Sequence, residues 1–164
     1  MLSTKNVAKG VHGASLTQRV EMLLASSEDV AVLAVNAARL ADQGEALRLA
    51  FPAVEFDFVV GYDTLVRLFD PAYYESMEAQ LAEFFSHHRV VAVNRGDDRI
   101  DAVMAFLGGG SARRFADRVI AMEVDDGHAT VSSSAAREAA SRGEQHEAVP
   151  GGVAAYIRAK GLYR

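Results

Sequence analysis

The sequence has no cysteine among its 164 residues, which excludes both a disulfide framework and a thiolate metal site. It also lacks an apolar run of about 20 residues, the length that a membrane-spanning helix needs. Residues 1–10 do not contain the apolar core of a secretory signal. Internal repeats and low-complexity tracts are absent as well. These absences favour a soluble intracellular protein, cytoplasmic or, in a eukaryote, also nuclear.

Charge of one sign is not concentrated in this chain. The net charge is −5, with acidic and basic residues mixed along the sequence. Binding to nucleic acid without sequence preference needs a dense cationic face, so we expect neither nucleic acid nor a membrane as partner. A local group of basic side chains can still hold one small anion. The oligomeric state is left open, a homo-oligomer included.

Half of the residues are apolar, enough to bury one core, and we predict a single domain over residues 1–164. Short apolar segments alternate with helical patterns and predict four strands, at residues 30–35, 54–60, 89–93 and 118–124. Strands that alternate with helices form parallel crossovers. The predicted fold class is therefore α/β, a Rossmann-like parallel sheet with helices on both faces.

Helix boundaries are indicated by capping residues. Ser15 and Gln18 form a capping box that predicts a helix start, and Asp70 before Pro71 predicts another. A weaker helix is predicted at residues 37–50, interrupted by Gly44, and the chain closes with two helices, at residues 134–142 and 149–160. Gly161 is the expected C-cap of the last helix, and residues 108–111 are an expected loop.

In an open α/β sheet, ligands bind beyond the carboxyl ends of the strands. The strand at residues 54–60 runs into Gly61, Tyr62, Asp63 and Thr64. A glycine there lets a ligand approach the backbone, and a carboxylate can accept hydrogen bonds from a ribose or an amide. The alternative is structural, with Gly61 as a turn residue and Asp63 as a helix N-cap.

A second candidate site is the hydroxyl run Ser132, Ser133 and Ser134, which precedes a short alanine-rich helix. Unpaired backbone N–H groups and the helix dipole favour an anion at such a start. Arg137 is expected within the first turn, where its guanidinium could add a bidentate phosphate contact. The alternative is a helix start with more capping hydroxyls than it needs and a solvated arginine.

Single basic residues are usually solvated, and Lys9 and Arg19 contribute to a phosphate site only if both converge on it. The adjacent His87 and His88 lack a spacing that would place two imidazoles on one metal, so surface positions are expected. The pair Arg113 and Arg114 is typical of a solvated face.

Three of these segments together resemble the nicotinamide and nicotinate mononucleotide adenylyltransferases. In that family a lysine precedes an R-x-x-M helix by ten residues, the spacing of Lys9, Arg19 and Met22. Residues 59–65 (VVGYDTL) are similar to the family's strand ending in G-x-D-[ST]-L. Residues 131–137 (VSSSAAR) resemble its I-S-S-T-x-x-R signature, and they are followed by the family's V-P, Y-I and G-L-Y pattern at the C-terminus.

The resemblance implies a nucleotidylyltransferase that joins a pyridine mononucleotide to the AMP part of ATP, releasing pyrophosphate. Arg137 and Ser132–Ser134 would then hold the ATP phosphates, and Lys9 would face the reacting phosphates. Asp63, with Gly61 and Thr64, would contact bound nucleotide. Magnesium would accompany ATP as a substrate complex. A non-catalytic nucleotide-binding module is the alternative.

One family element is missing from this sequence. The family begins with a strand and helix that carry G-x-F-[ND]-P and H-x-G-H, and neither motif occurs here. The chain is then a truncated reading of a longer protein, a fragment completed by a partner, or a lineage that has lost activity. Without the missing strands, the segments at residues 30–35 and 54–60 are not expected to share a ladder.

Overall fold

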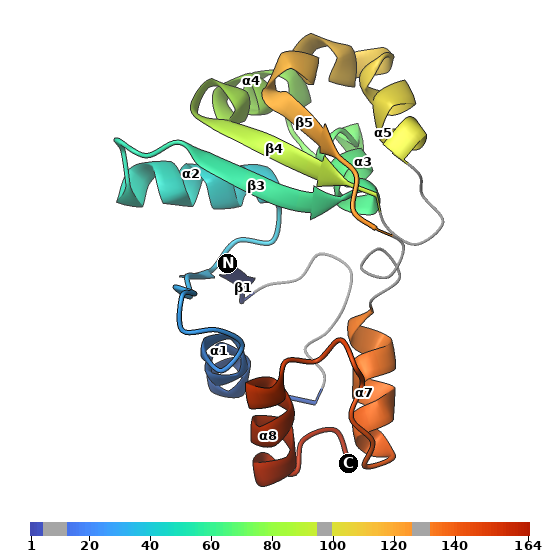
Figure 1. The fold of residues 1–164 in the computed structure, drawn as a ribbon. Helices are drawn as coiled ribbons and strands as arrows, with labels where there is room; N and C mark the ends of the chain where they lie inside the picture. Colours follow the sequence, from blue (N-terminus) through green and yellow to red (C-terminus); the bar gives the residue numbers. More distant parts are fainter. Residues whose placement is uncertain (5–12, 95–99, 126–131) are drawn as a thin grey trace. The chain divides into compact units, whose positions relative to one another are not determined.

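The computed structural model describes residues 1–4, 13–94, 100–125 and 132–164. The chain forms two compact units (Figure 1): unit 1 contains residues 1–38 and 131–164, and unit 2 contains residues 39–130. The fold is mixed α/β, with parallel sheets flanked by helices as in Rossmann-like proteins. In the described part of the chain, no helix combines the length and apolar character needed to cross a membrane.

Unit 2 contains a parallel three-stranded sheet in the order β3-β4-β5. Its strands are β3 (Phe56–Gly61), β4 (His88–Val93) and β5 (Val119–Met122). The helices between and around them are α2 (Leu40–Ala50), α3 (Tyr62–Leu68), α4 (Met77–His87) and α5 (Ile100–Leu107), with 3-10 turns η1 (Pro71–Tyr73) and η2 (Gly110–Arg118).

The core of unit 2 lies on one face of this sheet. Phe58, Val90 and Val119 are register partners in one row, and all three are buried against apolar side chains of the helices. The alternate row contains Val59 and Ile120, which are 69% and 41% exposed, and between them Val91 of the central strand, which is buried. Strand pleating sends neighbouring residues to opposite faces, so the register determines which row faces this core.

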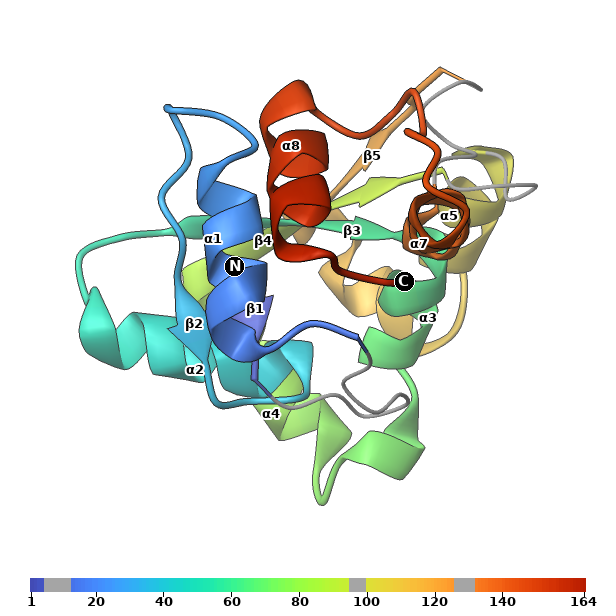
Figure 2. The same ribbon diagram turned by 90° about the horizontal axis from the view of Figure 1, so that it is seen from below.

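Unit 1 combines the two ends of the described chain. Its elements are β1 (Leu2–Ser3), α1 (Leu16–Leu24), β2 (Ala34–Val35), α7 (Ser133–Ser141) and α8 (Gly151–Lys160). β1 and β2 pair in parallel, and α1 and α8 lie side by side in both views (Figures 1 and 2). The Ser15–Gln18 capping box and the left-handed Gly161 C-cap, with φ of 60°, confirm two predicted helix ends.

The strand predictions are confirmed in unit 2 with boundary shifts, and the first strand is much shorter than predicted. Only Ala34 and Val35 of residues 30–35 form a ladder, because the two residues of β1 pair with these two alone. β2 and β3 belong to separate sheets, so residues 30–35 and 54–60 share no ladder, as predicted.

Two helix predictions and one loop prediction are corrected. Gly44 does not interrupt α2; it is a buried position where a Cβ would lie 2.6 Å from the Phe84 ring, so the glycine allows α2 to approach α4. Asp70 caps the 3-10 turn η1 by accepting from the Ala72 amide at 2.9 Å, and the α-helix begins only at Met77. The segment predicted as a loop at residues 108–111 already enters η2 at Gly110.

Candidate functional site

Unit 1 contains a cavity of about 380 Å³ lined by α1, α7, α8 and the ends of the chain. Arg19 of α1 and Arg137 of α7 both line it, as do Ser26 and Ser133. The rest of the wall is mostly apolar, and it includes Leu2, Met22, Leu23, Val149, Val153, Ile157 and the Tyr163 ring. An apolar wall with a few convergent polar groups is the usual make-up of a small-molecule site.

The two arginines of this cavity differ from most arginines that the structure describes. Ion pairs with carboxylates hold Arg39, Arg48, Arg67, Arg89, Arg114, Arg118 and Arg142. Within the described residues, no carboxylate forms such a pair with Arg19 or Arg137. Arg137 instead donates from Nη2 to the Ser134 hydroxyl at 3.1 Å. Two guanidinium groups without a carboxylate partner among these residues make the cavity attractive to an anion.

The start of α7 supports the same electrostatic preference. Ser132 is the N-cap, and its hydroxyl accepts from the Ala135 amide at 3.1 Å. The capping alternative therefore holds for Ser132, while Ser133 lines the cavity. Arg137 is in the second turn of α7 rather than the first, because the helix begins one residue earlier than predicted. The positive end of the helix dipole and Arg137 still act on the same cavity.

Contacts between α1 and α8 hold the apolar wall in place. The Tyr156 hydroxyl donates to a Glu21 carboxylate oxygen. This hydrogen bond, aided by desolvation, raises the pKa of Tyr156 to about 12. The Tyr163 hydroxyl lies 4.0 Å from the Met22 sulfur. The helices thus fix Met22 and Tyr163 beside the two cavity arginines.

The other predicted nucleotide contacts belong to unit 2. Gly61 is the N-cap of α3, at the carboxyl end of β3. Asp63 accepts from Arg67 Nη2 at 2.6 Å in an i,i+4 ion pair, and the Thr64 hydroxyl accepts from the same nitrogen at 3.3 Å. The N-cap alternative for Asp63 is wrong, because that position is occupied by Gly61. Gly61, Asp63 and Thr64 do lie at the carboxyl end of β3, as predicted.

Asn94 is a polar residue at the same sheet edge that sequence reasoning missed. It follows β4 directly and is buried, and its amide bonds both backbone groups of Val124: Nδ2 donates to the carbonyl at 2.9 Å, and Oδ1 accepts from the amide at 2.6 Å. The side chain therefore extends the β4–β5 pairing beyond the ladder. A polar residue immediately after the apolar run VVAV was the available signal.

The histidine prediction is half wrong. His87 is exposed at the end of α4, but His88 begins β4 and is buried to 1% exposure. Arg113 and Arg114 are both exposed, as predicted for a solvated face, and Arg114 forms a surface ion pair with Glu78. Among the described residues, no group of three or more His, Asp or Glu side chains is placed to hold a metal ion. Lys9 lies outside the described residues.

No protein-family model matches this sequence. A search of curated proteins also finds no match.

Proposed function

We propose that this chain is a Rossmann-type adenylyltransferase that joins a pyridine mononucleotide, nicotinamide or nicotinate, to the AMP part of ATP. The product is NAD or its acid precursor. The observation that supports the proposal is the unit 1 cavity. Arg19 and Arg137 both line it, although they belong to distant parts of the sequence. Its volume of about 380 Å³ falls within the range of sites for small organic ligands.

The reaction needs positioning and charge neutralisation more than covalent help from the protein. An oxygen of the mononucleotide phosphate attacks the α-phosphorus of ATP, and the bond from that phosphorus to the bridging oxygen breaks, releasing pyrophosphate. Cations lower the barrier by stabilising the charge on the transferring and leaving groups. In our proposal Arg137, the Ser133 region of α7 and Lys9 supply this stabilisation, and magnesium enters as part of the ATP complex.

In this proposal the apolar wall of the cavity binds the ring of the nucleotide. Met22, Ile157 and the Tyr163 ring offer a surface for a flat heteroaromatic ring beside the phosphate-binding arginines. A nucleotide presents this combination of ring and anion. Gly61, Asp63 and Thr64 of unit 2 are proposed to contact nucleotide as well, by analogy with the resembling family.

The test is a turnover assay beside a binding titration on the full chain. ATP, magnesium and either mononucleotide are incubated with the protein, and dinucleotide and pyrophosphate are quantified; ATP binding is measured by calorimetry. Turnover supports the enzyme. Binding of ATP without turnover supports a non-catalytic nucleotide-binding module instead, and absence of both overturns the proposal.

Arg137→Ala connects the result to the cavity. We expect ATP binding to weaken by about 1.5–3 kcal/mol, the range for a charge-assisted hydrogen bond. The thermal midpoint should change little, because within the described residues the Arg137 guanidinium forms one hydrogen bond, to the exposed Ser134 hydroxyl. Arg142→Ala is the matched control, since Arg142 follows the same helix and pairs with Glu138 and Glu144. Equal ATP affinity in the two folded variants removes Arg137 from the site.

A further inference from the structure

His88 is the most deeply buried ionisable residue that the structure describes, and the proposed reaction does not use it. Its ring is enclosed by those of Phe56, Phe58 and Phe84, with centroid separations of 5.8, 5.4 and 5.5 Å. Gly44 of α2 also faces it, where a Cβ would lie 3.0 Å from the imidazole. The imidazole therefore sits at the junction of α2, α4, β3 and β4.

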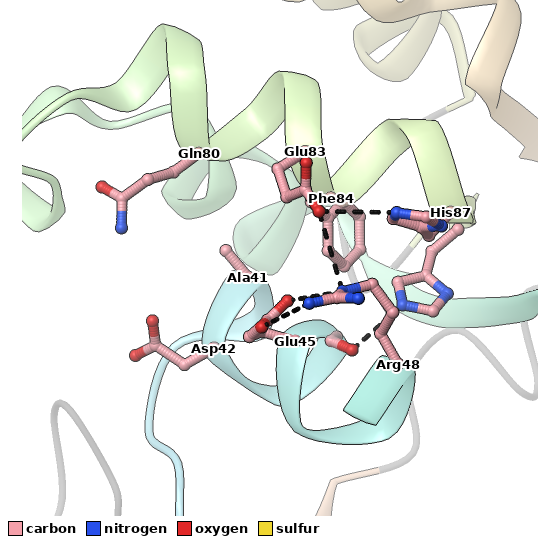
Figure 3. Close-up of a pocket in the computed structure, with 10 residues that line it drawn as sticks. Ala41, Asp42, Glu45, Arg48, Gln80, Glu83, Phe84 and His87 are labelled. Atoms are coloured by element: carbon pink, nitrogen blue, oxygen red, sulfur yellow. Dashed lines mark hydrogen bonds and ion pairs between the residues drawn. The ribbon is translucent and has the colours of Figure 1, made fainter. Parts of the chain in front are cut away.

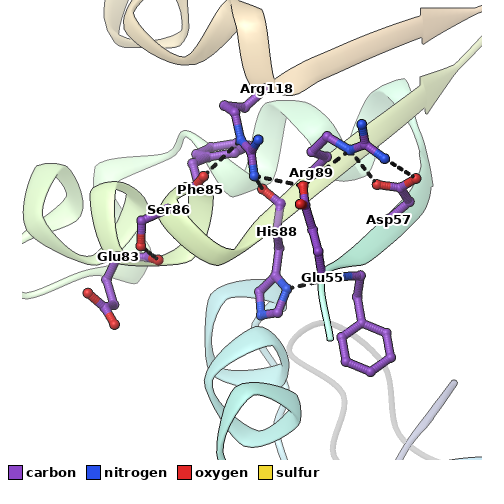
Figure 4. Close-up of polar contacts among 9 residues, drawn as sticks. Glu55, Asp57, Glu83, Phe85, Ser86, His88, Arg89 and Arg118 are labelled. Carbon is purple, nitrogen blue, oxygen red and sulfur yellow. Dashed lines mark hydrogen bonds and ion pairs between the residues drawn. The ribbon is translucent and has the colours of Figure 1, made fainter. Parts of the chain in front are cut away.

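Both ring nitrogens of His88 have a backbone partner. Nε2 lies 3.0 Å from the carbonyl oxygen of Gly44, and the Phe56 amide donates to Nδ1 at 3.4 Å. A carbonyl can only accept and an amide N–H can only donate, so this network requires a neutral ring with its proton on Nε2. Figure 4 shows the ring between α2 and the start of β3.

A second proton on this ring would break the arrangement. It would sit on Nδ1 and face the Phe56 N–H, so two donors would oppose each other in a buried site. Burial correspondingly lowers the pKa of His88. Glu55, the carboxylate that precedes β3, is already bound by Arg118 at 2.9 Å and by Arg89 at 3.3 Å, so little of its charge remains to balance an imidazolium.

The α2–α4 side of the ring borders a cleft lined by charged side chains. This cleft, of about 160 Å³, lies between these helices, with Phe84 in its wall (Figure 3). His88 and Gly44 also form part of its lining. Carboxylates of Glu45 and Glu83 line the same cleft, together with Arg48 and His87. Arg48 bonds Glu45 at 2.8 Å and lies 3.7 Å from Glu83, while His87 lies 3.4 Å from Glu83.

We propose that His88 is an acid-sensitive lock between α2 and the start of β3. The neutral ring holds the Gly44 carbonyl and the Phe56 amide together. The protonated ring keeps its Nε2–H bond to the Gly44 carbonyl but turns a second N–H against the Phe56 amide, which releases the first residue of β3. This device is independent of the proposed adenylyltransferase activity.

The direction of the pH response follows from the two protonation states. In the unfolded chain a histidine has a pKa of about 6.5, and in the folded chain the pKa of His88 is lower. The unfolded or unlocked state therefore takes up the proton first. The lock is fully effective above about pH 6.5 and weakens as the pH falls from there toward the lower folded pKa.

Amide hydrogen exchange at Phe56, measured by NMR on the full chain at pH 7.5 and 5.0 and corrected for intrinsic rates, tests the lock. We expect protection of this amide to fall about tenfold at pH 5.0 relative to Val91 in the middle of β4, the order of magnitude that one linked proton allows. His87→Gln, which changes the adjacent exposed histidine, should keep this response. His88→Gln should abolish the pH dependence. Unchanged protection in the wild type, or the same acid loss in His88→Gln, overturns the proposal.

A measurement on the wild type covers the case in which His88→Gln fails to fold. In 15N spectra of the imidazoles, His88 should show the Nε2-protonated tautomer at pH 7.5 and titrate below the ordinary histidine pKa of about 6.5. Titration of His88 at or above the ordinary histidine pKa, with the Phe56 amide still protected, overturns the lock.

Discussion

Gly152 of α8 packs against the carbonyl oxygen of Ala25, the C-cap residue of α1, so closely that a Cβ at position 152 would lie 2.3 Å from that oxygen. Because the obstacle is backbone, it cannot move aside as a side chain would. Gly152→Ala should therefore separate the two helices and lower the free energy of unfolding by about 1–3 kcal/mol, the usual cost of overpacking.

The adjacent glycine provides the control for this prediction. A Cβ at Gly151 would meet nothing within 4 Å, so Gly151→Ala should leave stability unchanged or raise it slightly through the better helix propensity of alanine. Thermal unfolding followed by circular dichroism compares the two variants. Equal midpoints would contradict the close packing of α8 on α1.

Arg19 should contact the anionic part of the ligand rather than its ring. We expect Arg19→Ala to weaken the binding of ATP and of inorganic tripolyphosphate by a similar factor, about tenfold or more, while adenosine binding is unchanged. Calorimetric titrations measure all three. Arg158→Ala serves as control, because Arg158 bonds Gln145 on the same unit and does not line the cavity. Loss confined to adenosine would place Arg19 at the base instead.

Asn94→Asp should destabilise unit 2 although it barely changes the shape of the side chain. Aspartate keeps the acceptor for the Val124 amide but lacks the donor for the Val124 carbonyl, and it places a charge in a buried position. A loss of about 1–3 kcal/mol is expected in denaturant unfolding. Asn36→Asp should change stability much less, because Asn36 is exposed and, among the described residues, its side chain accepts one hydrogen bond, from Thr4.

Tyr156 should ionise only near pH 12, because its hydroxyl bonds the Glu21 carboxylate. The contact favours the protonated phenol, so its contribution to stability is present below about pH 10 and is lost as the pH rises toward 12. Glu21→Gln should lower the pKa of Tyr156 toward the ordinary value in an NMR titration. Tyr74 is the internal control: burial raises its pKa to about 12, and the variant should not alter it. An unchanged Tyr156 would mean that the hydrogen bond does not form in solution.

The sequence predicts those parts of the fold whose signals are local. The contiguous apolar runs of β3 and β4, the capping box at Ser15 and the C-cap at Gly161 all depend on neighbouring residues, and the structure contains each of them. Residues 30–35 carry an equally apolar run, yet only two residues pair, because strand length is set by a partner distant in sequence.

The candidate site also combines features that local sequence predicts with features that depend on tertiary packing. The placement of Ser133 near Arg137 follows from helix geometry, whereas the convergence of Arg19 and Arg137 on one cavity depends on how α1, α7 and α8 pack. The two adjacent histidines differ for a related reason. The helix ends at His87 and the strand begins at His88, so the change of backbone direction turns one ring outward and the other inward. No pattern within two identical residues specifies that boundary.

The division of the chain into units also determines the order in which they can be completed during synthesis. Unit 2 is a continuous segment, residues 39–130, whereas unit 1 needs residues 1–38 together with residues 131–164. A ribosome supplies every residue of unit 2 before it supplies α7 and α8, and domains fold as units during translation. Residues 1–38, which include Arg19, are therefore synthesised first. Helix α1 has no α8 to pack against until residues 131–164, which include Arg137, leave the ribosome.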